Sequence, residues 1–118
     1  MYTQYPMQEL PVINRAQELY EVVCKITDTL ASLQRQTIGR RLEGAILQLL
    51  ELLIMAKYAP KALKGPYLIK ASAQVEIIQF MLRILLNQKL ANETTLHQHQ
   101  ARVIEIGRML GGWRKSVQ

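Results

Sequence analysis

Positively charged side chains are the chemical groups that this sequence offers most plentifully to a ligand. The 118 residues include 15 lysines and arginines against 9 acidic residues, which gives a net charge of +6 and a pI of about 9.7. Residues 1–30 hold two bases and four acids, whereas the remaining 88 residues hold 13 bases and five acids. A segregated positive field suits phosphate groups, so the composition favours a nucleic-acid partner. A basic surface that serves only solubility is the alternative.

Residues suited to catalysis or metal binding are few. The single cysteine, Cys24, cannot form a disulfide within the chain or a cysteine-based zinc site. His97 and His99 are two positions apart on a predicted helix, so they point to different faces and cannot hold one metal well. His99 shares a face with Val103 and Ile106 and is expected to be a half-buried structural residue. No glycine-rich phosphate loop or nucleophile elbow is present. We therefore expect neither an enzyme nor a metal or cofactor site.

Two adjacent arginines form the most specific candidate for a phosphate contact. Arg40 and Arg41 follow Thr37, a residue that can cap the N-terminus of a helix. Cations are unfavourable in the first turn of a helix unless they serve a ligand, and backbone N–H groups beside two guanidiniums make a phosphate site. The alternative is a solvated turn that tolerates its charges.

Helices must position these groups, because no alternating strand pattern is present. Apolar residues at helical spacing predict a first helix over about residues 11–33 and a second over 37–58. The third opens after Gly65 and Pro66 and runs to about Lys89. Asn92 begins the cap of the fourth, which ends near Lys115.

The predicted fold is all-α, an antiparallel up-down-up-down four-helix bundle. Short connections make each helix antiparallel to the next. The bundle spans residues 11–118, and residues 1–10 are expected to be a flexible segment without a signal peptide. No apolar run is long enough to span a membrane, so we expect no membrane partner. The single cysteine fits a reducing compartment, so we expect a cytoplasmic protein.

The second and third helices carry more apolar residues than a bundle core uses. Both keep only a narrow polar stripe, although a bundle helix needs roughly a three-in-seven apolar face. The surplus predicts a homo-oligomer in which Ile77, Phe80 and Ile84 contribute to the interface. The alternative is that both helices are central in the bundle.

The predicted topology gathers cations at both ends of the bundle. The connection between the second and third helices lies at the same end as the two termini, and no acidic residue occurs between Glu51 and Glu76. That end should carry Lys57, Lys61, Lys64, Lys70, Arg114 and Lys115, and the other end Arg35, Arg40 and Arg41. Because aromatic residues are few, we expect contacts with phosphates and nucleic-acid shape rather than stacking on single bases.

Three glycines interrupt the end of the last helix, in GRMLGGWRKS over residues 107–116. Gly107 and Gly111 are four apart and predict a packing slot for another helix, within or between subunits. Trp113 is expected to anchor the helix end in the core. Gly112 lies off this flank and has no physical explanation.

Two stretches resemble the accessory variability determinant proteins of diversity-generating retroelements. IEIGRMLGGWRKS is similar to the C-terminal signature of that family, and QRQTIGRRLEGAILQLLELLIMAKYA, residues 34–59, is similar to its second helix. The similarity extends loosely over about residues 10–116. The chain departs from the family pattern just before Arg35. The resemblance leads us to expect a proline-containing turn there, but residues 30–34 contain no proline.

The resemblance implies properties that the residues alone do not give. Members of this family are four-helix bundles that assemble into homopentameric rings, bind nucleic acid and associate with a reverse transcriptase. They support mutagenic copying of a template RNA into complementary DNA and have no known catalysis of their own. The ribosomal-RNA intervening-sequence proteins share the bundle and the ring.

The combined prediction is a non-catalytic accessory subunit. A basic ring would hold RNA or an RNA–DNA hybrid against the reverse transcriptase, through phosphate contacts from Arg35, Arg40, Arg41, Lys57, Lys61, Lys64, Lys70, Arg83, Arg108, Arg114 and Lys115. Two alternatives stay open: a stand-alone RNA-binding bundle of the intervening-sequence group, and a structural protein-interaction module.

Overall fold

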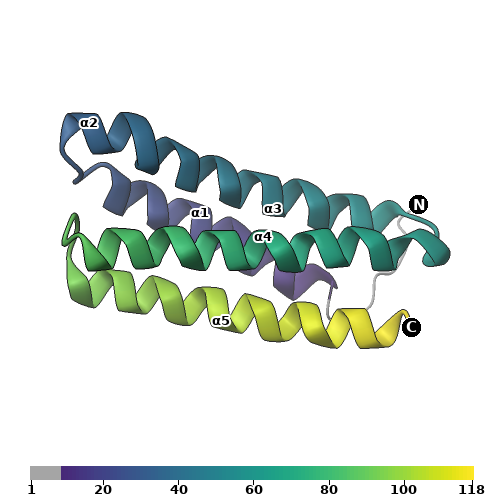
Figure 1. Ribbon diagram of the computed structural model, residues 1–118. Coiled ribbons are helices and arrows are strands. Elements are labelled where there is room, and N and C mark those ends of the chain that lie inside the picture. The colour runs from purple at the N-terminus through teal and green to yellow at the C-terminus, as the bar shows by residue number, and fades with distance from the viewer. Residues whose placement is uncertain (1–8) are drawn as a thin grey trace.

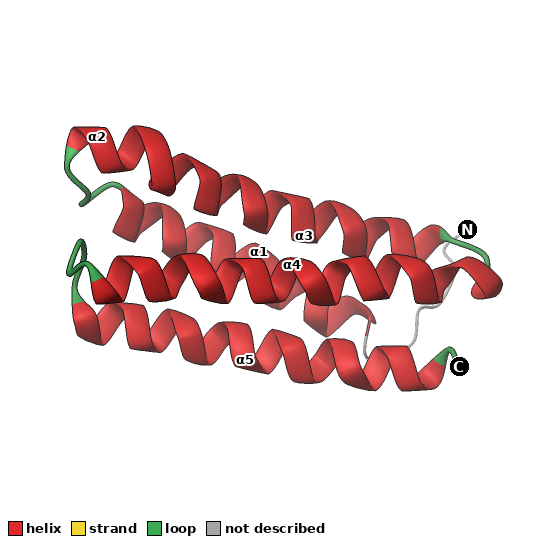
Figure 2. Ribbon diagram, in the orientation of Figure 1, coloured by secondary structure: helices red, strands yellow, loops and turns green. Residues whose placement is uncertain are grey.

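A computed structural model describes residues 9–118, all of whose regular elements are helical (Figures 1 and 2). Residues 1–8 of the predicted flexible segment lie outside the described residues, and residues 9 and 10 already belong to the first helix. The elements are α1 (Glu9–Thr27), α2 (Ser32–Gln34), the π-helical η1 (Arg35–Gly39), α3 (Arg40–Tyr58), α4 (Lys61–Asn87) and α5 (Glu93–Ser116).

The four long helices form an elongated bundle of 45 × 24 × 20 Å. α3 packs against α1 and α4, and α5 packs against α4 and α1, so each helix contacts two antiparallel neighbours. The start of α1 and the C-terminus lie toward the same end as the α3–α4 connection (Figure 1). The predicted up-down-up-down four-helix bundle is therefore confirmed.

The core is a continuous apolar column contributed by all four long helices. Trp113 is its largest side chain and is fully buried near the end of α5. One buried polar contact ties α1 to α3: the hydroxyl of Thr27 donates a hydrogen bond to the carboxylate of Glu43. This contact fixes the crossing of the two helices next to their connection.

The connection between α1 and α3 differs from the prediction. α1 ends at Thr27, six residues early, because the chain turns there with bonds from the N–H groups of Thr29 and Leu30 to the preceding turn. Helical structure resumes at Ser32 and continues through η1 into α3. Thr37 is therefore not an N-cap: its hydroxyl donates to the carbonyl of Leu33 at 2.9 Å.

The predicted start of the third helix is also wrong. α4 begins at Lys61 and continues through Gly65 and Pro66. Proline fits helical φ but lacks an N–H, so only the carbonyl of Ala62 loses its helical partner, and Ala62 is exposed. The predicted cap of α5 is confirmed, since the Asn92 side chain accepts a bond from the Thr95 N–H at 2.9 Å.

Within residues 9–118, none of the helices combines the length and the apolar character that crossing a membrane requires.

Candidate nucleic-acid interface

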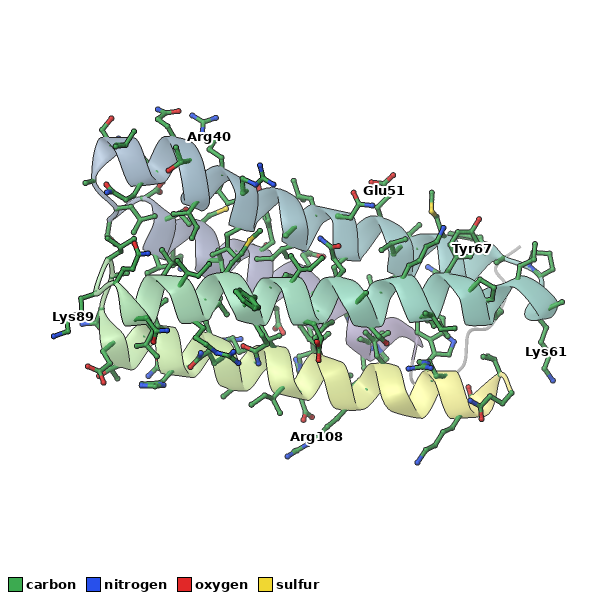
Figure 3. All side chains as sticks on the ribbon, viewed as in Figure 1. Arg40, Glu51, Lys61, Tyr67, Lys89 and Arg108 are labelled. Atoms are coloured by element: carbon green, nitrogen blue, oxygen red, sulfur yellow. The ribbon has the colours of Figure 1, made fainter. Side chains whose placement is uncertain are left out.

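Nine of the eleven predicted cations form two groups at opposite ends of the bundle. Figure 3 places Arg40 near one end and Lys61 at the other. Arg40 and Lys57 are both on α3, and 17 residues at 1.5 Å each separate them by roughly 26 Å along its axis. One small ligand therefore cannot contact both groups, whereas a nucleic-acid strand can.

Arg40 and Arg41 do not lie at a helix N-terminus. The helical segment starts at Ser32, and the Arg40 N–H already bonds to the carbonyls of Arg35 and Thr37. This N–H group is therefore already bonded. The prediction that free backbone N–H groups form a phosphate site beside the two arginines is wrong. Two adjacent, exposed guanidinium side chains remain.

The opposite end carries a dense positive charge without acidic neighbours in sequence. Residues 52–75 and 106–118 contain no aspartate or glutamate. Lys61, Lys70 and Lys115 are exposed there, whereas Lys57 and Arg114 are half-buried. We refer to these five residues, together with Lys64, as the basic end.

Lys64 has a structural contact within the basic end. Its ammonium donates hydrogen bonds to the carbonyls of Ala56 and Lys57, at 2.7 and 2.9 Å. These carbonyls belong to the last turn of α3, where no further helical N–H is available to them. Lys64 therefore caps α3, and a phosphate at this ammonium would have to compete with these bonds.

Arg83 and Arg108 belong to neither of these two groups. Arg83 lines a groove of about 600 Å³ between α4 and α5, and its guanidinium carbon is 5.9 Å from the centre of the Phe80 ring. Arg108 is exposed on α5 with a weak contact to Glu105 at 3.7 Å. The pairing of Arg83 with Phe80 was missed by the sequence reasoning, which assigned Phe80 only to an oligomer interface. Their spacing of three residues on a helix was the available signal.

The glycines of α5 do not form a packing slot within the subunit. A side chain at Gly111 would meet no atom within 4 Å, and one at Gly107 would make an ordinary 3.8 Å contact with Val75. The slot between subunits remains a prediction. Gly112 is likewise open, and nothing in the structure explains it.

The exposed apolar side chains concentrate on α3 and α4. The α3 stripe consists of Leu47, Ile54, Met55 and Tyr58, and the α4 stripe of Ile69, Ile77, Phe80 and Ile84. Phe80 is 61% exposed and Ile77 43%, whereas Ile84 is half-buried. No large apolar side chain described on α1 is exposed. Because each helix contacts two neighbours, the alternative that α3 and α4 are simply central in the bundle does not hold.

The remaining polar groups provide little reactive chemistry. No three histidine, cysteine or acidic residues gather as a metal site among residues 9–118. Burial is the largest cause that raises the pKa of the Cys24 thiol, which keeps it protonated and poorly nucleophilic at neutral pH. His97 lies 3.7 Å from Glu93 at the surface, and His99 is buried.

Comparison with known proteins gives one family match. A family model described as bAvd-like matches residues 11–117, nearly the whole chain. No curated protein matches the sequence.

Proposed function

The chain belongs to the bAvd-like family, and from this premise we propose that it is a non-catalytic accessory subunit of a diversity-generating retroelement. In this role it is a cytoplasmic homo-oligomer that holds structured RNA or an RNA–DNA hybrid against a reverse transcriptase. The reverse transcriptase supplies the chemistry, and this subunit supplies phosphate-binding surface. No cofactor or metal is needed for that task.

The observation that carries the proposal is the basic end. Exposed lysines lie there on α4 and α5, in parts of the chain without acidic residues. Contacts of this kind neutralise phosphates and release counterions without reading bases. A closed ring would repeat each cation in every subunit, which turns a modest monomer charge into a strong field.

The two apolar stripes support the oligomeric part of the proposal. A cyclic ring needs two different surfaces on each subunit, one for each neighbour. The α3 and α4 stripes meet that need, with Ile77, Phe80 and Ile84 on the α4 side. The number five comes from the resemblance described above.

The test compares two variants that each lose three positive charges. One replaces Lys61, Lys70 and Lys115 with Gln, and the matched control replaces Arg15, Lys25 and Arg102 on the α1 side. The basic-end variant should bind single-stranded RNA more weakly, and the slope of log K against log salt should fall by about 2, since each lost phosphate contact contributes about 0.7. Lys64 is left intact because it caps α3.

Equal losses in both variants would show that only net charge matters and would contradict the assignment of the basic end.

Reverse-transcriptase pull-down from the same preparations separates the two nucleic-acid hypotheses. RNA binding without polymerase capture would favour the stand-alone bundle of the intervening-sequence group, and no salt-sensitive RNA binding would favour a structural module.

A further inference from the structure

The groove between α4 and α5 combines an exposed aromatic ring with a guanidinium. Phe80 and Arg83 project from successive turns of α4, with the guanidinium over the ring. No ion pair among the described residues involves Arg83. A flat apolar ring beside an unpaired planar cation is the surface on which unstacked bases rest in RNA complexes.

Amide and carboxylate groups line the same groove. The Gln79 side chain donates from Nε2 to the Gln100 carbonyl at 3.1 Å, which holds the side chain in place and leaves its Oε1 as an acceptor. Glu76, one turn before Phe80, contributes a second acceptor and has no ion pair among residues 9–118. The groove therefore offers a stacking surface and a rim of acceptors.

The α5 wall leaves room for a nucleic-acid backbone. Gly107 lines the groove, and Gly111 lies one turn further along the same flank, where a side chain would meet nothing within 4 Å. Arg108 and Lys115 share a helix face with Ile104 at the groove edge, and both are exposed. Phosphates that flank a bound base would reach these cations toward the basic end.

Contrary to the expectation drawn from the few aromatic residues, we infer that the α4–α5 groove binds a single unpaired nucleobase, whose face stacks on Phe80 and Arg83. The acceptors of Glu76 and Gln79 select a base that carries an amino group, such as cytosine, over uracil. The volume of about 600 Å³ is within the range of small-ligand sites. The inference rests on the proposed function, because the base belongs to the strand that the cations hold.

A neighbouring subunit is a poorer occupant of this groove. An apolar stripe seated there would desolvate Glu76 and Arg83 without giving them hydrogen-bond partners, which is costly. Phe80 belongs to the α4 stripe and also lines the groove, so its two roles must be separated by experiment.

The test uses a short single-stranded RNA and an abasic strand of the same length, with the full chain as its native oligomer. Phe80→Leu keeps apolar bulk but removes the ring, and Phe80→Trp keeps a ring as the matched control. Phe80→Leu should weaken binding of the base-bearing strand at least roughly 5-fold, the lower limit for one lost stacking contact. Its binding of the abasic strand and its salt slope should stay unchanged, and Phe80→Trp should bind like wild type.

Three results would overturn the inference. The first is equal binding of the base-bearing strand by Phe80→Leu and wild type. The second is a native mass that falls for Phe80→Leu with an equal loss of affinity for both strands, because the loss would then follow from the oligomer interface and not from base stacking. The third is equal affinity of the wild type for abasic and base-bearing strands, which leaves the phosphate contacts of the proposed function intact. Failure of the wild type to bind either strand would refute the proposed function itself.

Oligocytidine should bind more tightly than oligouridine, and the reverse order would refute the role of Glu76 and Gln79.

Discussion

His99 is the buried polar residue whose environment departs most from its ordinary chemistry. It is 4% exposed, more buried than the half-buried position that its helical spacing predicts, and neither ring nitrogen has a hydrogen-bond partner in the described structure. Burial is the main cause that lowers its pKa, the charge of Arg102 adds to the effect, and the backbone of Val22 opposes it. Lys25 also lines the shallow surface around it. The folded state therefore holds a neutral imidazole.

This lowered pKa predicts a loss of stability in mild acid. In the unfolded chain His99 takes up a proton near pH 6.5, whereas in the folded chain it does so only at lower pH. The unfolded state then binds more protons, so the free energy of unfolding should fall as pH drops below about 6.5, by at most about 1.4 kcal/mol per pH unit. Urea unfolding at pH 7.5 and 5.5 measures this change. His99→Leu should flatten it, and an unchanged pH dependence in that variant would contradict the assignment.

At the scale of the helix, apolar spacing predicts which segments are helical but not where each begins. Thr37 and the Gly65–Pro66 pair are strong local boundary signals, yet both lie inside helical structure. Packing overrides the boundary signal at Thr37, because Gly39 in η1 lies against Leu30. A Cβ atom at position 39 would approach Leu30 Cδ1 to 3.2 Å. Such contacts depend on how the turn after α1 folds back, which no local pattern contains. They also explain the glycine in the RQTIG stretch that resembles the accessory-protein family.

Two glycines of this continuous helical segment predict different responses to alanine. Gly44 is in the interior of α3 with open space around it, so Gly44→Ala should stabilise the protein by about 0.5–1 kcal/mol through lower unfolded-chain entropy. Gly39→Ala should forfeit this gain, because its methyl group must displace Leu30 and lies 3.4 Å from the Gln34 carbonyl oxygen. Thermal unfolding of the two variants gives the comparison, and an equal rise in Tm for both would contradict the close packing of Gly39.

At the scale of the whole molecule, topology alone explains much of the candidate site. Short connections place the α3–α4 turn at the same end as the start of α1 and the end of α5, so the basic end follows from the sequence once four helices are recognised. The α4–α5 groove does not follow from the sequence in this way. It depends on the register of α4 against α5, which is seen in the hydrogen bond from Gln79 to the Gln100 carbonyl. Likewise, the role of Lys64 as a cap depends on the three-dimensional course of the chain between α3 and α4.

The symmetry of the assembly also belongs to the whole molecule. If the α4 stripe met its own copy, the contact would be two-fold and would close as a dimer. If the α4 stripe of one subunit met the α3 stripe of the next, the contact would be head-to-tail and would close as a ring. The two stripes lie on neighbouring but separate helices of one bundle, so each stripe can be disrupted by itself. The two arrangements make different predictions for variants that lose one stripe.

Mixing two such variants distinguishes the arrangements. Leu47→Asp with Ile54→Asp disables the α3 stripe, and Ile69→Asp with Ile77→Asp disables the α4 stripe, because a buried unpaired carboxylate is far costlier than the apolar contact it replaces. In a head-to-tail ring each variant alone should be monomeric by native mass spectrometry, and an equal mixture should form a one-to-one heterodimer through the single intact pair of stripes. Leu33→Asp, at an exposed position outside both stripes, is the control and should keep the wild-type mass. If the α3 variant alone forms dimers, α4 pairs with itself and the ring arrangement is wrong.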